Sequence, residues 1–139
     1  MKLTNILQDE KLTLSFEVFP PKSDADFESV KDAAYRVAAL QPGYMSVTYG
    51  AGGSTAGNTL AIAEGIQKTY DVPTIAHLTC VGATRESIRR SLTDMKAAGV
   101  ENVLALRGDR PSWMEREPFT DYHYASELVA TIREFDDFC

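Results

Sequence analysis

The sequence contains little cysteine and no long apolar run. Its two cysteines, Cys80 and Cys139, are too few for the disulfide framework of a small secreted domain. No apolar stretch approaches the roughly 20 residues that span a bilayer, and residues 1–10 lack the apolar core of a signal peptide. We therefore expect a cytoplasmic protein without a membrane segment.

Basic residues are also scarce, because 14 Lys and Arg stand against 20 Asp and Glu, a formal net charge of -6. A surface of this sign repels a phosphate backbone, which argues against nucleic acid as a partner. A metal site is not expected either. His77 and Cys80 are three positions apart, and residues at that spacing on a strand point to opposite faces. No further His/Cys cluster completes a ligand set.

The composition is otherwise that of an ordinary globular protein, 44% hydrophobic over 139 residues, and two periodicities alternate along it. Apolar residues at every second position predict strands, and apolar residues at helical spacing predict helices. Strands are expected at 11–19, 44–48, 74–78 and 102–106, each followed by a helix. The fourth strand is so apolar that we expect it to be buried on both faces.

Local signals mark where the helices begin and end. Ser23 and Asp24 offer an N-cap for the first helix, Thr84 offers one for the third, and Gly99 suits the residue just past the third helix. The βαβαβαβα pattern predicts one α/β domain with a parallel sheet. Both an open doubly wound sheet and part of a (βα) barrel fit, and both place chemistry at the carboxyl ends of the strands.

The first strand ends at Glu17, which lies between Phe16 and Phe19 in the sequence. Glutamate is depleted in strands and costly to bury without a partner. One interpretation is a carboxyl group whose pKa is raised by an apolar setting, so that it serves as a general acid. The other is a half-exposed glutamate on the polar face of the strand with Thr13 and Ser15.

The second and third strands end in weaker signals. Residues 50–54, Gly-Ala-Gly-Gly-Ser, would let backbone amides approach a ligand. They match neither a P-loop nor a dinucleotide fingerprint, so a flexible loop is the simpler interpretation. His77 is more often a hydrogen-bonded core residue than a functional one. Cys80 is most simply a small buried hydrophobe.

The fourth strand ends in Arg107-Gly108-Asp109, which suggests paired side chains at the edge of the sheet, with a structural salt bridge as the simpler interpretation. The following loop is longer than most βα loops. Trp113 and Phe119 either belong to a lid over a ligand or pack the loop down, and we favour packing.

Polar residues gather at one end of four successive strands. They are Glu17, Thr48, His77 and the pair Arg107 and Asp109. A sheet buried on both faces has little structural reason to collect them there. The joint pattern favours an enzyme or a ligand-binding site over a purely structural domain.

Five segments, in order, carry a family resemblance: SFEVFPPK at 15–22, SVTYGAGG at 46–53, AHLTC at 76–80, NVLALRGD at 102–109 and YASELV at 124–129. They resemble the motifs of the methylenetetrahydrofolate reductase family, flavin enzymes of one-carbon metabolism and methionine biosynthesis. The resemblance implies an eight-stranded (βα) TIM barrel, of which residues 1–139 supply about the first four βα units.

The resemblance further implies an oxidoreductase that binds FAD, takes electrons from NADH or NADPH and reduces methylenetetrahydrofolate to methyltetrahydrofolate. Glu17 matches the general acid that helps open the folate ring to an iminium cation, and Asp109 matches an aspartate near flavin and folate. Members are usually cytoplasmic homo-oligomers. The positions that match family contacts to FAD are Thr48, Tyr49, Ala51, His77, Arg107, Gly108, Asp109, Tyr124 and Ala125.

A (βα) barrel needs about 250 residues, so this chain is expected to be a truncated, amino-terminal half with open sheet edges and an uncovered inner face. Three hypotheses follow. The chain is a reductase or the amino-terminal part of one, a non-catalytic half-barrel that needs a complementing carboxyl-terminal half, or an unrelated nucleotide-binding module.

The loop after Asp109, RPSWM, departs from the Pro- and Gly-rich loop of many relatives.

Overall fold

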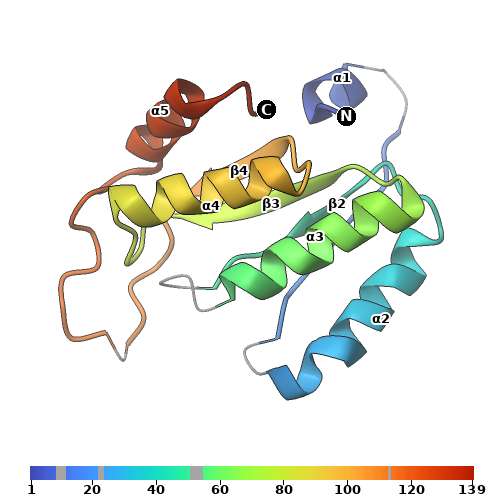
Figure 1. Cartoon of the computed structure of the whole chain (residues 1–139), viewed down its shortest axis with the longest axis horizontal. Coiled ribbons are helices and arrows are strands. Elements are labelled where there is room, and N and C mark those ends of the chain that lie inside the picture. Colours follow the sequence, from blue (N-terminus) through green and yellow to red (C-terminus); the bar gives the residue numbers. More distant parts are fainter. Residues whose placement is uncertain (9–11, 22–23, 51–54, 113) are drawn as a thin grey trace.

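The computed structural model describes residues 1–8, 12–21, 24–50, 55–112 and 114–139 (Figure 1). Its elements are α1 (Leu3–Leu7), β1 (Ser15–Val18), the 3₁₀ turn η1 (Asp24–Asp26), α2 (Phe27–Ala38), β2 (Tyr44–Val47), α3 (Ala56–Tyr70), β3 (Thr74–Thr79), α4 (Arg85–Ala97), β4 (Asn102–Leu106) and α5 (Ala125–Phe135). The expected alternation of strands and helices is confirmed. Helix α1 is an addition that the sequence pattern did not predict.

The four strands form one parallel sheet in the order β1-β2-β3-β4. Each strand therefore pairs with the next strand in the sequence. A doubly wound sheet reverses its strand order at a switch point, whereas a (βα) barrel does not. The sheet order resolves the two architectures in favour of four consecutive units of a TIM-barrel-like fold.

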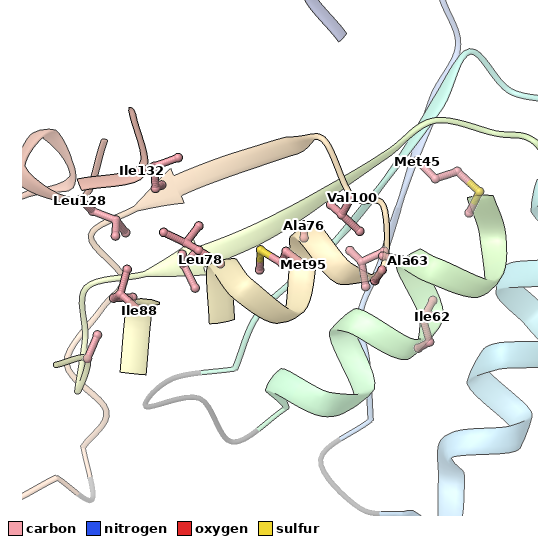
Figure 2. Close-up of a cluster of buried hydrophobic side chains, with 14 of the residues drawn as sticks. Met45, Ile62, Ala63, Ala76, Leu78, Ile88, Met95, Val100, Leu128 and Ile132 are labelled. Carbon is pink, nitrogen blue, oxygen red and sulfur yellow. The ribbon is translucent and has the colours of Figure 1, made fainter. Parts of the chain in front are cut away.

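One face of this sheet is covered by helices. Figure 1 shows α3 and α4 running along the same side of the strands, and their apolar residues pack on side chains that alternate along β2 and β3. Figure 2 shows part of this core. Its fully buried members include Met45, Val47, Ala76, Leu78, Ile62, Ile66, Ile88, Leu92 and Leu128. Burying one such large side chain contributes about 1.5–3 kcal/mol, so this face holds the fold together.

The opposite face of the sheet, here called the inner face, carries the side chains of Ser15, Glu17, Ser46, His77, Thr79, Leu104 and Leu106. In β4, Val103 and Ala105 pack against the core, while Leu104 is 42% and Leu106 is 37% exposed. The expectation that this strand is buried on both faces is wrong, because helices cover only one side of the sheet. An open inner face is what half of a barrel would present.

The predicted limits of α4 are confirmed by its caps. Thr84 Oγ1 accepts a hydrogen bond from the backbone N–H of Ser87 at 3.1 Å, and Ser87 Oγ accepts one from that of Thr84 at 2.9 Å. Gly99 follows the helix with φ +76°, a conformation that favours glycine.

Helix α2 begins later than predicted, after Asp26. The expected cap at Asp24 is wrong because residues 24–26 form the turn η1, which delays the α-helical hydrogen bonds. Ser23, the other proposed cap, lies outside the described residues.

The two chain ends lie beside β4. Asn102 Oδ1 accepts a hydrogen bond from the Leu3 backbone at 2.7 Å, which places the first residues at the amino end of the sheet. The backbone carbonyl of Cys139 accepts a hydrogen bond from the Val103 N–H at 2.9 Å, and the backbone N–H of Cys139 donates one to the Glu101 carbonyl at 2.8 Å. This is the hydrogen-bond pattern of a neighbouring parallel strand. In the part of the chain that the structure describes, no helix is both long and apolar enough to cross a membrane.

Candidate functional site

Glu17 lies near the carboxyl end of β1 and contacts residues of the next two strands. Its Oε2 accepts a hydrogen bond from Ser46 Oγ at 3.2 Å and lies 3.7 Å from His77 Nε2. The register pairs Glu17 directly with Ser46, so the two side chains point to the same face. The structure thus brings together two predicted site residues and adds Ser46, which the sequence reasoning missed.

The environment of Glu17 matches the second of the two interpretations. Its side chain is 46% exposed. The expected apolar enclosure by Phe16 and Phe19 is wrong, because strand alternation points Phe16 to the other face and Phe19 is 67% exposed. Glu17 is therefore a partly solvated carboxyl group on the inner face, accessible to a small molecule.

His77 is buried, with 5% of its surface exposed, and its Nε2 has no hydrogen-bond partner among the residues that the structure describes. The burial expected of a core histidine is confirmed, but Nε2 does not make the hydrogen bond expected with it, because Glu17 Oε2 lies beyond hydrogen-bond distance. Burial lowers the pKa of His77 from 6.5, and the negative charge of Glu17 opposes part of that shift. Burial therefore favours the neutral form of the imidazole.

Thr79, two residues further along β3, carries a second unpartnered polar atom. Its Oγ1 is buried and makes no hydrogen bond within the described ranges, and the side chain lies on the same face as His77. A buried polar group without a partner costs about 1–3 kcal/mol. Two such atoms on one strand end fit a site where a polar ligand supplies the missing hydrogen bonds.

Thr48, directly after β2, is held against α3. The backbone carbonyl of Thr48 accepts a hydrogen bond from Thr59 Oγ1 at 2.7 Å. Tyr49 is partly buried against the core. Ala51, a predicted FAD contact, belongs to residues 51–54, which lie outside the described residues.

Arg107 follows β4 and makes two contacts. Its Nε donates to the His123 carbonyl at 3.1 Å, and its guanidinium carbon lies 3.8 Å from the ring centroid of Phe119. Asp109 is exposed and, within the described residues, has no hydrogen bond or ion pair. The expected pairing of Arg107 with Asp109 is therefore wrong.

Gly108 separates these two side chains by a left-handed turn, with φ +74°. A Cβ atom at this position would lie 2.7 Å from Val81 Cγ1 and 3.3 Å from Thr79 Cβ. Both the backbone conformation and the close approach to the end of β3 require glycine.

The remaining predicted residues lie at the start of α5. Tyr124 is 66% exposed and Ala125 is half-buried. Phe119 is 7% exposed, which confirms that it packs the loop down, whereas Trp113 lies outside the described residues. Cys80 is confirmed as a buried core residue, and burial raises the pKa of its thiol.

The site therefore consists of two parts at the carboxyl end of the sheet. Glu17, Ser46 and His77 form a contact group on β1 to β3, and Arg107 with Phe119 lies beyond β4. The described residues include no group of three or more His, Cys, Asp or Glu side chains that could hold a metal ion. The site thus offers a carboxyl group, a buried imidazole and a guanidinium held by Phe119 and His123.

Comparison with known proteins gives a consistent result. A family model described as methylenetetrahydrofolate reductase matches residues 2–139. The chain is 40% identical over 134 residues to "Probable methylenetetrahydrofolate reductase (NADH)" of Oryza sativa subsp. japonica, covering 95% of this chain and 23% of that protein. It is 34% identical over 128 residues to "5,10-methylenetetrahydrofolate reductase" of Pectobacterium carotovorum subsp. carotovorum, covering 92% of this chain and 42% of that protein.

One solved structure is similar to this chain in its fold, and the comparison with it concerns the fold only. It is described as "Structural study of Project ID from Aquifex aeolicus VF5" and is 12% identical to this chain, with a TM-score of 0.59. The match covers 97% of this chain and 55% of that chain. The chain thus spans less than half the length of the two reductases and about half of the solved structure.

Proposed function

The chain belongs to the methylenetetrahydrofolate reductase family, and from this we propose that it forms the amino-terminal half of an FAD-dependent reductase barrel. The reaction is the reduction of methylenetetrahydrofolate to methyltetrahydrofolate with electrons from NADH or NADPH. The observation that carries the proposal is the contact group on the inner face, where Glu17 Oε2 lies 3.7 Å from the unpartnered His77 Nε2. This pair supports the proposal because a solvent-accessible carboxyl group lies beside a buried nitrogen that has no hydrogen bond within the described residues.

The residues present fit a flavin dinucleotide. The unpartnered atoms of His77 and Thr79 offer polar contacts inside the sheet, and Arg107 offers a cation for phosphate groups. When bound, FAD supplies hydride transfer. Thr48, Tyr49, Ala51, Gly108, Asp109, Tyr124 and Ala125 complete the proposed set of cofactor contacts.

Glu17 is the proposed general acid. The Ser46 hydroxyl donates to Oε2, which leaves Oε1 to carry a proton and deliver it to a nitrogen of the folate ring. His77 lies beside this carboxyl group, and burial lowers the pKa of His77, which favours its neutral form. A positioned acid of this kind contributes about 10²- to 10⁴-fold to a rate.

Asp109 is the proposed electrostatic partner of the substrate. Its carboxylate is exposed, and no described residue pairs with it. A carboxylate without a protein partner is available to face positive charge that develops on the folate.

The test is to add FAD to the purified chain, remove free flavin and record the absorbance spectrum. We expect retained flavin absorbance that bleaches with NADH or NADPH and returns with methylenetetrahydrofolate. A chain that retains no flavin, alone or with a complementing half, contradicts the proposal. Retained flavin that folate does not reoxidise supports a binding role without the reductase reaction.

A second candidate function is a half-barrel that acts only with a complementing carboxyl-terminal half. It is favoured by the exposure of Leu104 and Leu106 on the inner face, where a closed barrel would bury them. Mixing the chain with a separately expressed carboxyl-terminal half of a relative should then restore activity that neither piece has alone. Activity of the chain by itself would contradict this candidate.

A further inference from the structure

The guanidinium of Arg107 is fixed before any ligand arrives. Its carbon atom lies over the Phe119 ring, 3.8 Å from the ring centroid, and its Nε donates a hydrogen bond to the His123 carbonyl. Its terminal nitrogens have no partner among the described residues. These nitrogens carry most of the N–H donors of an arginine, so the side chain is held at one end and free at the other.

Phe119 is itself anchored on both sides. Its neighbour Pro118 accepts a hydrogen bond from the Gly82 N–H at 2.7 Å. Two residues later, Asp121 Oδ2 accepts one from the Arg85 N–H at 2.8 Å, at the start of α4. The ring is 7% exposed. It is therefore a rigid platform tied to the connection between β3 and α4, and not a mobile loop side chain.

We propose that Phe119 is a positioning residue that holds the guanidinium of Arg107 ready for the phosphate groups of the cofactor. This inference rests on the proposed function, because it names how that site recognises a diphosphate. An unconstrained arginine loses rotamer freedom when it binds, and that loss weakens binding. Contact with Phe119 orders the side chain in the free protein, so less freedom is lost when the phosphates bind.

The overall charge makes such positioning more important. With a net charge of -6, the protein does not attract a dinucleotide at long range. Within the site, Asp109 lies two positions from Arg107 and is exposed. A phosphate group must therefore be recognised at short range, by a guanidinium whose direction is already set.

The experiment compares Phe119→Leu with Phe119→Tyr, which keeps the aromatic ring. Binding of FAD, ADP and riboflavin is measured by calorimetry, and circular dichroism checks that each variant is folded. We expect Phe119→Leu to weaken FAD and ADP binding about tenfold and to leave riboflavin, which has no phosphate, within about twofold. Phe119→Tyr should match the unmodified chain for all three ligands.

A measurement without ligand tests the contact itself. The ring current of Phe119 should shift the side-chain proton resonances of Arg107 in the free protein. The shift should disappear in Phe119→Leu and persist in Phe119→Tyr. Equal resonances in both variants would contradict the stacking and hence the proposal.

Arg107→Lys provides a second route if Phe119→Leu does not fold. Lysine keeps the charge but cannot stack as a planar fork, so we expect the same loss of about tenfold for FAD and ADP. If Phe119→Leu does fold, it should cost nothing further in the Arg107→Lys background, because the two residues act as a unit.

The outcomes separate the two proposals. If the unmodified chain binds FAD and both Phe119→Leu and Arg107→Lys bind it equally well, the positioning role is overturned and the flavin function stands. If riboflavin binding falls as much as FAD binding, the role is not phosphate recognition and the inference is also overturned. If the unmodified chain binds neither FAD nor ADP, the proposed function fails and the inference fails with it.

Discussion

Nε2 of His77 lies 3.7 Å from Oε2 of Glu17, although β2 lies between the strands that carry them. Neighbouring strands are about 4.8 Å apart, so strands one and three of a flat sheet would be roughly twice that distance apart. The two side chains therefore lean toward each other over Ser46, which donates to the same carboxylate oxygen. This convergence on the inner face is the geometric basis of the candidate site.

Replacing Glu17 by Gln should remove folate reduction and leave oxidation of NADH or NADPH intact, because only the folate step needs a proton from this carboxyl group. We expect a loss of about 10²- to 10⁴-fold in the folate half-reaction. Stopped-flow absorbance of the flavin measures both half-reactions, in the chain alone or in the chain mixed with a complementing half, whichever is active. Glu134→Gln, at an exposed position of α5, is the control. Equal loss of both half-reactions would show that Glu17 is not the folate acid.

Replacing Ser46 by Ala should remove the hydrogen bond to Glu17 Oε2 and lower the free energy of unfolding by about 1 kcal/mol. Urea denaturation measures this change. In a Glu17→Ala background the same substitution should cost less, because the acceptor is already absent. Identical costs in the two backgrounds would mean that the contact does not contribute to stability.

The buried imidazole of His77 predicts a dependence of stability on pH. Its pKa in the folded protein lies below 6.5, chiefly because of burial, so the unfolded chain binds the proton more readily. Stability is then fully present above about pH 6.5 and falls as the pH drops toward the folded pKa, by at most about 1.4 kcal/mol per pH unit.

Urea denaturation at about pH 7.5 and pH 5.5 tests this sign. The variant His77→Gln should show a smaller loss over the same interval, because it has no proton to gain at that position. His123, which is exposed, serves as the matched control through His123→Gln. A pH dependence that His77→Gln leaves unchanged would assign the effect to other groups.

Gly108→Ala should destabilise the fold by about 1–3 kcal/mol, because φ is +74° and the new methyl group would lie 2.7 Å from Val81 Cγ1. Gly57→Ala is the matched control in α3, where a Cβ atom meets nothing within 4 Å. That change should stabilise the protein by about 0.5–1 kcal/mol. Thermal unfolding measures both, and a neutral Gly108→Ala would contradict the described turn.

Local sequence patterns predict much of the fold. The strand at 102–106 and the cap at Thr84 lie where the alternation and the capping signal predicted them, because such features depend on neighbours a few residues away. The start of α2 was misplaced, since nothing in the pattern distinguishes the 3₁₀ turn at 24–26 from a first helical turn.

The contacts of the candidate site were harder to predict. Sequence reasoning selected Glu17 and His77 separately, but only the register of β1 and β2 identifies Ser46 as the donor between them. It also paired Arg107 with Asp109, neighbours in the sequence, whereas the turn at Gly108 separates them. The actual partner of Arg107, Phe119, lies 12 positions away in a loop whose path no local rule describes.

The sequence by itself determined the order of strands and helices, the absence of a long apolar span and the family, because these depend on residue type and spacing along the chain. The tertiary structure decided which face of the sheet stays open, which atom His77 faces and what holds Arg107. Those properties arise when segments distant in sequence pack together, and a side chain acquires its solvation and its partners only in that packing.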